Sequence, residues 1–482
     1  MNFASKAFFI FLPIVLLVYH WLPRRNSKYR FLLLASWIFY AWAVPYYFWV
    51  IIFTSVVDYA AGILIENAST PAGKRRWLLL SLVTNLGFLA AFKYTAFAVD
   101  NVLTLARALG WPDAPDWRLD ILLPLGISFH TFQGISYTVD VYRGKIPAVR
   151  RFVDFALFVA FFPQLVAGPI VRAVEFLPQL VTPPRVTSSQ VIEGLHWFLL
   201  GLFKKVFIAD RLAQFVDIVF AHPGQYDPVT HVWAVLAYAG QIYCDFSGYS
   251  DLAIGCAKWF GFELPRNFNF PYLSDSIAEF WKRWHITLST WMRDYLYISL
   301  GGSRQGSSRT YFNLLLTMTL CGLWHGSRWN YVLWGFYNGV LLVLHRLGDR
   351  ALTGRAWADR LRAAPVYRLL TIVTTFWLVA IGLVMVRSQT WTGCLLVEQS
   401  LCGTAVTAVA PATAAAQRWL PAWVPLLVGL VAAGHAFSGL RDRRCGVLEL
   451  PPLVRAGAYA SAVFLIVAFG PGATKSFIYF QF

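Results

Sequence analysis

Two histidines stand out because an imidazole can accept a proton from a hydroxyl group near neutral pH. His285 lies in the charged, tryptophan-rich stretch SDSIAEFWKRWHITLSTWMRDYLYISLGGSR. His325 ends an apolar run, in the tetrapeptide LWHG. An ionisable group at membrane depth is costly and usually lines a cavity or a pathway. His325 is therefore a candidate general base. The alternative is a structural histidine that bonds a backbone carbonyl at a helix end.

The stretch around His285 has the pattern of an amphipathic helix. Ser276 followed by Glu279 forms a capping box, which predicts a helix start. Apolar residues then recur every three or four positions. In one continuous helix, Lys282, His285 and Ser289 share a face, which suits an anionic, phosphate-bearing donor. The alternative is an interfacial helix with a structural histidine.

Other polar residues fall inside apolar segments. Asp245 and Asp251, in QIYCDFSGYSD, could orient a histidine or carry a proton, but structural pairing with a lysine or arginine is the favoured interpretation. His130 and Gln133, in GISFHTFQG, are expected to form helix–helix hydrogen bonds. The chain has no P-loop, zinc motif or GxSxG elbow, so we predict no metal site.

The composition places these residues in a membrane protein. Hydrophobic residues make up 58% of the 482 residues and charged residues only 13%, against about 25% in soluble domains. The formal net charge is +17, but the basic residues cluster in short segments between apolar runs. That distribution is the positive-inside pattern and favours contact with anionic lipid, so we exclude nucleic-acid binding.

The apolar segments predict an all-α, polytopic membrane helix bundle forming one integral domain, residues 1–482. Breaks at Pro163, Gly168 and Pro169 indicate a re-entrant segment. Charges near 276–298 indicate a helix on the membrane surface or tilted into the bundle. The apolar segments are 7–23, 30–44, 46–65, 76–98, 119–140, 152–170, 190–221, 231–260, 309–326, 329–347, 366–387, 420–438 and 455–470.

The charges between these segments predict the topology. Basic clusters mark the cytoplasmic side, and basic-poor segments mark the opposite side, which places both termini outside the cytoplasm. Cys394 and Cys402 fall in the basic-poor segment 388–417, and we predict a disulfide between them. The basic clusters lie at 74–76, 143–151, 204–205, 346–368 and 441–444.

Six sequence blocks resemble the membrane-bound O-acyltransferase (MBOAT) family, in its bacterial alginate O-acetyltransferase branch. Five of them lie between about residues 121 and 340, the predicted core carrying the active site, and the sixth closes the chain. Together they are highly specific. The blocks are GISFHTFQGISYTVDVYRG, FFPQLVAGPIVR, QIYCDFSGYSDLAIG, NFNFPYLSDSIAEFWKRWHITLSTWMRDYLYISLGGSR, LCGLWHGSRWNYVLWGFYNG and FIYFQF.

The resemblance implies a function in the bacterial inner membrane. It implies two opposed funnels that meet at the active site, with His325 as the catalytic histidine and His285 as the second family histidine. The acyl group expected is acetyl, from acetyl-CoA, and the acceptor expected is an exopolysaccharide hydroxyl such as that of alginate. The hydroxyl would be reached directly or through an extracytoplasmic partner of the SGNH-hydrolase type. No bound cofactor is expected. The candidate substrate-binding residues are Lys282, Ser289, Trp324, Asp245 and Asn330.

Two other functions remain open from the sequence. One is D-alanyl transfer to teichoic acid, although the closing FIYFQF favours the alginate-type branch. The other is a proton-coupled transporter or flippase, in which Asp245, Asp251 and His325 form a proton path. The apolar tail is expected either to pack on the bundle or, as the implied partner suggests, to form a docking surface through Tyr479 to Phe482.

Overall fold

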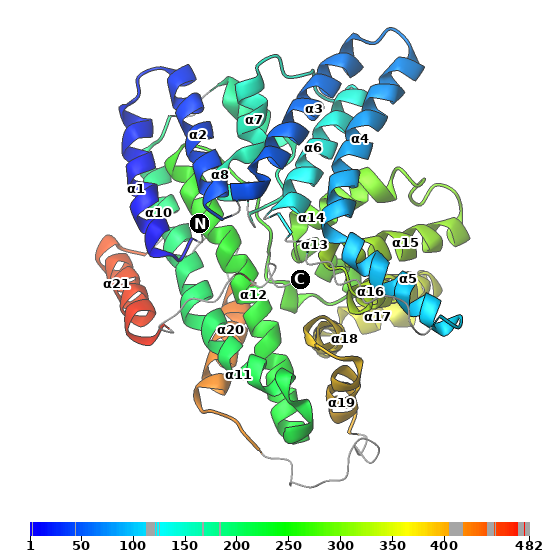
Figure 1. The fold of residues 1–482 in the computed structure, drawn as a ribbon. Coiled ribbons are helices and arrows are strands. Elements are labelled where there is room, and N and C mark those ends of the chain that lie inside the picture. Colours follow the sequence, from blue (N-terminus) through cyan, green and yellow to red (C-terminus); the bar gives the residue numbers. More distant parts are fainter. Residues whose placement is uncertain are drawn as a thin grey trace.

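Helices form the architecture of the protein, and the described residues contain no strand (Figure 1). The predicted all-α class is therefore confirmed. The computed structural model describes all residues except 2, 44, 112–120, 122, 125, 166–167, 183–184, 404–417, 441–447, 449, 471–476 and 478–482.

The helices follow the predicted apolar segments closely. In the first half they are α1 (Lys6–Trp21), α2 (Arg25–Ala43), α3 (Phe48–Asn67), α4 (Pro71–Lys93), α5 (Thr95–Ala108), α6 (Ile127–Tyr142), α7 (Phe152–Ala160), α8 (Phe162–Leu165), α9 (Ala173–Val181), α10 (Ser188–Leu202), α11 (Asp210–Ala221) and α12 (Pro228–Trp259). In the second half they are α13 (Ile277–Arg283), α14 (Ile286–Trp291), α15 (Ser307–His325), α16 (Trp329–Leu352), α17 (Ala356–Ala363), α18 (Pro365–Arg387), α19 (Trp391–Leu401), α20 (Trp423–Leu440) and α21 (Pro452–Phe469). Short 3-10 helices cover η1 (Pro45–Tyr47), η3 (Pro223–Gln225) and η4 (Pro271–Leu273), and π-helices cover η2 (Phe203–Ala209) and η5 (Met292–Tyr297).

Helix α12 runs through the middle of the bundle (Figure 1). It begins sharply because the Asp227 carboxylate accepts a hydrogen bond from the backbone N–H of Thr230 at 2.7 Å, and Pro228 occupies the first turn. Its side chains are buried on every face over most of its 32 residues, as expected of a helix surrounded by others. Helices α10 and α11 pack along it. The central helix thus provides the frame for the site described below.

Several helices are suited to crossing a membrane. By length and composition, Pro45–Asn67, Pro365–Arg387 and Pro452–Phe469 qualify among the described residues. Helices α4 and α5 qualify together but are bent by 61° at Tyr94, within the predicted apolar segment 76–98, and α5 continues ten residues beyond that segment. The predicted break in the sixth apolar segment is present, because α7 ends at Ala160 and the next helix has only four residues.

Two predictions about the C-terminal part are affected by the structure. The Cys394–Cys402 disulfide is wrong, because both thiols are free and the two residues lie at opposite ends of helix α19. Eight positions along a helix separate two residues by about 12 Å, too far for a disulfide.

In the tail, Phe477 is fully buried against Phe246 and Tyr249. Residues 479–482 lie outside the described residues, so docking there stays a prediction.

The carboxylates of α12 are held by consecutive lysines. Lys205 in η2 pairs with Asp245 at 2.5 Å and with Asp210 at 2.8 Å, and all three side chains are almost completely buried. Lys204 pairs with Asp251 at 2.7 Å. The predicted structural pairing is confirmed. The interpretation of these two lysines as part of a cytoplasmic loop is wrong, because they form the π-helical turn that packs on α12.

We predict that Lys205→Met destabilises the protein by about 3–5 kcal/mol, because it removes the cation from two buried carboxylates. The matched control is Arg362→Met, which breaks the exposed pair with Asp349 and should cost at most about 1 kcal/mol. Thermal unfolding of both variants in detergent measures the difference. Equal shifts would show that the buried cluster contributes no more than a surface pair.

Candidate functional site

His285 sits at a break in the expected surface helix. Helix α13 ends at Arg283 and α14 begins at Ile286. His285 between them has φ 41°, in the left-handed region, which is strained for a residue other than glycine. The single helix predicted over 276–298 is therefore wrong. Its predicted start is correct, because the Ser276 hydroxyl accepts a hydrogen bond from the N–H of Glu279.

Asn267, a residue in the loop after α12, holds this strained turn in place. Its carbonyl accepts from the N–H of Ile286 at 2.9 Å, and its side-chain oxygen accepts from the Thr287 hydroxyl at 2.6 Å. Its side-chain nitrogen donates to the Ser250 hydroxyl of α12 at 3.0 Å. Asn267 itself is buried. The turn that carries His285 is thereby tied to the central helix.

The break separates three residues that were predicted to share a face. His285 is fully buried, whereas the Lys282 side chain is 73% exposed and pairs with Glu279 at 3.4 Å. The Ser289 hydroxyl donates to the carbonyl of Trp284 at 3.2 Å. The prediction of a common Lys282–His285–Ser289 face is wrong, because the left-handed residue turns α14 away from the register of α13.

The two predicted histidines come together from the turn between α13 and α14 and from the end of α15. His325 is the last residue of α15, and the ring centroids of His285 and His325 are 6.4 Å apart. Trp324 lies beside both imidazoles, with centroid distances of 6.2 Å to His285 and 5.0 Å to His325. Trp324 also stacks on Phe132 of α6 at 5.1 Å. Phe246 of α12 contacts the other side of His285 at 4.6 Å.

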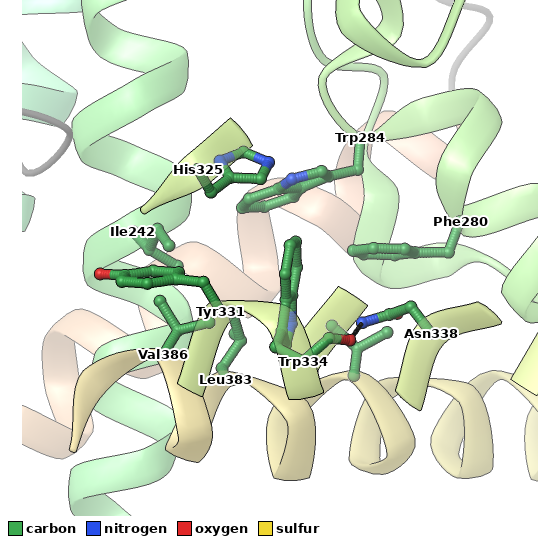
Figure 2. A pocket seen from close by; sticks show the side chains of 10 residues that line it. Ile242, Phe280, Trp284, His325, Tyr331, Trp334, Asn338, Leu383 and Val386 are labelled. Atoms are coloured by element: carbon green, nitrogen blue, oxygen red, sulfur yellow. Dashed lines mark hydrogen bonds between the residues drawn. The ribbon is translucent and has the colours of Figure 1, made fainter. Parts of the chain in front are cut away.

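His325 opens onto a small cavity of about 20 Å³, lined by aromatic and aliphatic side chains (Figure 2). The rings of Trp284 and Trp334 face the imidazole, with Trp334 at 5.2 Å and nearly perpendicular. Helix α18 closes the opposite wall with aliphatic side chains. The lining residues are Ile242, Phe280, Trp284, His325, Tyr331, Trp334, Asn338, Val379, Leu383 and Val386.

None of the five candidate substrate-binding residues lines the cavity, and two of them have structural roles in other parts of the bundle. The Asn330 amide donates to the carbonyls of Met385 and Ser388, at 3.2 and 3.3 Å, and so joins α16 to α18. Asp245 belongs to the ion cluster with Lys205. Neither residue lines the cavity.

The cavity walls were not predicted from the sequence. Trp284 and Trp334 did not stand out in the sequence because the chain has 21 tryptophans, and most of these are explained by the preference of tryptophan for membrane interfaces. A sequence signal did exist for Lys93, a charged residue within the apolar segment 76–98 that the structure buries next to His325. Its contacts are described below.

Among the described residues, neither ring nitrogen of His130 has a hydrogen-bond partner, so the helix–helix hydrogen bond expected of His130 is not formed. The side-chain oxygen of Gln133 has no partner either, and a bond through its side-chain nitrogen stays a prediction. Both residues are buried in α6. Nor do the described residues contain a group of three or more histidine, cysteine or acidic side chains that could hold a metal ion.

Comparison with known proteins gives a consistent result. The model of the membrane-bound O-acyltransferase family, MBOAT, matches residues 145–385. A probable alginate O-acetylase of Azotobacter vinelandii is 45% identical over 81% of this chain and 75% of its own length. A peptidoglycan O-acetyltransferase of Helicobacter pylori is 38% identical over 71% of this chain and 70% of its own. A teichoic acid D-alanyltransferase of Bacillus subtilis is 27% identical over 54% and 67%.

We predict that Gly326→Ala disturbs the cavity wall. A Cβ on Gly326 would lie 2.3 Å from the ring of Tyr331, so the ring must move, at a cost of about 1–3 kcal/mol. Gly348→Ala is the control, because a Cβ there meets nothing within 4 Å and alanine favours a helix. Thermal unfolding in detergent should show a lower midpoint for Gly326→Ala alone. An unchanged midpoint would mean that the Tyr331 ring has room to shift.

Proposed function

This chain belongs to the membrane-bound O-acyltransferase family, and we propose that it moves an acetyl group from cytoplasmic acetyl-CoA to an exopolysaccharide hydroxyl outside. The observation that carries the proposal is the meeting of His285 and His325, 6.4 Å apart, beside a small cavity that one of them lines. An acyl transfer needs a proton acceptor for the hydroxyl and a place for the acyl group. The pair and the cavity supply these two requirements.

His325 acts as the general base in this proposal. One ring nitrogen accepts the proton of the acceptor hydroxyl while the hydroxyl oxygen attacks the thioester carbonyl. The C–S bond then breaks, and the thiolate of the donor leaves with that proton. His285 positions the donor or stabilises the charge that develops on the thioester oxygen. Trp324 contacts the rings of both histidines and stacks on Phe132. In this way it fixes the orientation of the two imidazoles.

The size and chemistry of the cavity favour an acetyl group. A volume of about 20 Å³ is little more than the space of a water molecule, which suits a two-carbon group better than a fatty acyl chain. D-alanine would bring an ammonium group, and none of the lining residues is acidic. A buried cation without a partner is unfavourable. Acetyl transfer is therefore preferred over D-alanyl transfer.

The names of the relatives support a polysaccharide acceptor. Alginate O-acetylase and peptidoglycan O-acetyltransferase both describe acetylation of a polymer built outside the cytoplasm. We therefore place the chain in the bacterial inner membrane, with two opposed funnels, both termini outside, and an extracytoplasmic SGNH-type partner that receives the acetyl group. The segment 121–340 carries the histidines, while α18 completes the cavity.

The function is tested by reconstituting the purified protein in vesicles, with [¹⁴C]acetyl-CoA outside and alginate inside. The assay is done with and without a partner acetyltransferase in the lumen. Mass spectrometry of the polymer then detects O-acetyl groups. Labelled polymer supports the proposal, and the partner requirement shows whether transfer is direct. D-alanyl esters from a charged carrier protein, or ion flux without acyl transfer, would instead support one of the other two functions.

We predict that His325→Ala lowers the transfer rate about 10²–10⁴-fold, because it removes the proton acceptor. Donor binding, measured by calorimetry, should persist, and the protein should insert normally since a costly polar group is lost from the bundle. His285→Ala should weaken donor binding or slow transfer less completely. Transfer by His325→Ala within a few-fold of wild type would end the general-base assignment.

We predict that Trp334→Leu enlarges the cavity and relaxes the choice of acyl group. The ratio of butyryl to acetyl transfer should rise at least about tenfold, the range expected when methylene groups gain space in an apolar pocket. Trp281→Leu is the matched control, since Trp281 is as buried as Trp334 and packs against it without lining the cavity. Competition between the two acyl-CoAs, read by mass spectrometry, measures the ratio. A ratio that rises equally in both variants would show that Trp334 does not set acyl length.

A further inference from the structure

Lys93 is a buried cation whose side chain has no acidic partner among the described residues. It is the last residue of α4 and only 9% exposed. The hydrogen bonds of its ammonium go to backbone carbonyls. A lysine at such depth is costly and is usually retained for a function. The groups that the Lys93 ammonium contacts therefore point to its function.

The contacts of Lys93 and its neighbour lie on the last turn of α15. The Lys93 ammonium donates to the carbonyls of Trp324 and His325, the latter at 3.2 Å. The Tyr94 hydroxyl donates to the carbonyl of Leu323 at 3.0 Å. The ammonium also lies 5.8 Å from the centre of the Trp324 ring. Two adjacent residues thus bind three consecutive carbonyls at the helix end that carries His325.

This arrangement follows from the physics of helix ends. The last four carbonyls of a helix accept no hydrogen bond from the helix itself. The helix C-terminus also carries a partial negative charge, which interacts favourably with a cation. The two donors lie at the 61° bend between α4 and α5, and it is there that they contact this helix end. A neutral donor could satisfy one carbonyl. An ammonium satisfies two and adds the charge interaction.

We propose that Lys93 is a positioning residue for His325, fixing the last turn of α15 so that the imidazole faces both the cavity and His285. The proposal rests on the acetyl transfer proposed above. Lys93 acts through backbone carbonyls and does not line the cavity. Its loss should therefore lower the rate of the chemical step while leaving donor affinity unchanged. A merely structural residue would change the amount of folded protein instead.

The test compares Lys93→Met, which keeps the length and removes the charge, with Lys93→Arg, which restores a cation. We expect Lys93→Met to lower kcat for acetyl transfer at least about tenfold, with KM for acetyl-CoA within about twofold of wild type. Lys93→Arg should recover kcat to within about threefold. Arg75→Met, an exposed cation on the same helix, is the control and should change neither constant. All rates are divided by the folded fraction from thermal unfolding.

Lys93→Gln, which keeps an uncharged amide donor, replaces Lys93→Met in the comparison if Lys93→Met does not fold, and we expect its kcat to be lower than that of both wild type and Lys93→Arg. An unchanged kcat in the folded uncharged variant, or a loss that arginine does not restore, overturns the role of Lys93. Wild type and His325→Ala are measured in parallel. Absence of transfer by wild type, or full activity of His325→Ala, would count against the proposed function rather than against Lys93.

Discussion

The site depends on one strained backbone residue, His285, held in the left-handed conformation by the hydrogen bonds that Ile286 and Thr287 donate to Asn267. Without the break, the imidazole would stay in the register of an amphipathic helix and face the same direction as the exposed Lys282. With the break, it lies inside the bundle, 6.4 Å from His325. The strain of about 1–3 kcal/mol expected for such a residue is offset by bonds that tie the turn to α12. The geometry of the pair is thus a property of the tertiary structure.

Much of the fold follows from the sequence because apolar runs of membrane length leave few alternatives to a helix. The start at Ser276 was also predictable, because its hydroxyl bonds the Glu279 N–H locally. The break at His285 was not, since the apolar periodicity continues from Phe280 through Leu288 and the bonds that favour it come from Asn267. The periodicity within one segment does not show which distant residues will form hydrogen bonds with it.

The candidate site residues, too, differ in how far their positions depend on tertiary packing. His325 and Trp324 were identified because they are polar or aromatic groups in a specific motif, and the structure brings them beside His285. Lys282 and Ser289 were selected from a helical spacing that the break removes. The cavity walls include Trp334 and residues of α18, which no spacing relates to His325. Those contacts depend on how α15, α16 and α18 pack.

The burial of Phe477 bears on how the protein is made. Its ring contacts Phe246 at 5.5 Å, and Phe246 in turn contacts His285 at 4.6 Å. Phe3 reaches the same place through Tyr249. During synthesis on the ribosome, residue 477 emerges long after the helices that carry the two histidines. The surroundings of His285 are therefore completed only after residue 477 has been made, so a nascent chain in which both histidines are already inserted lacks a finished site until Phe477 packs against Phe246.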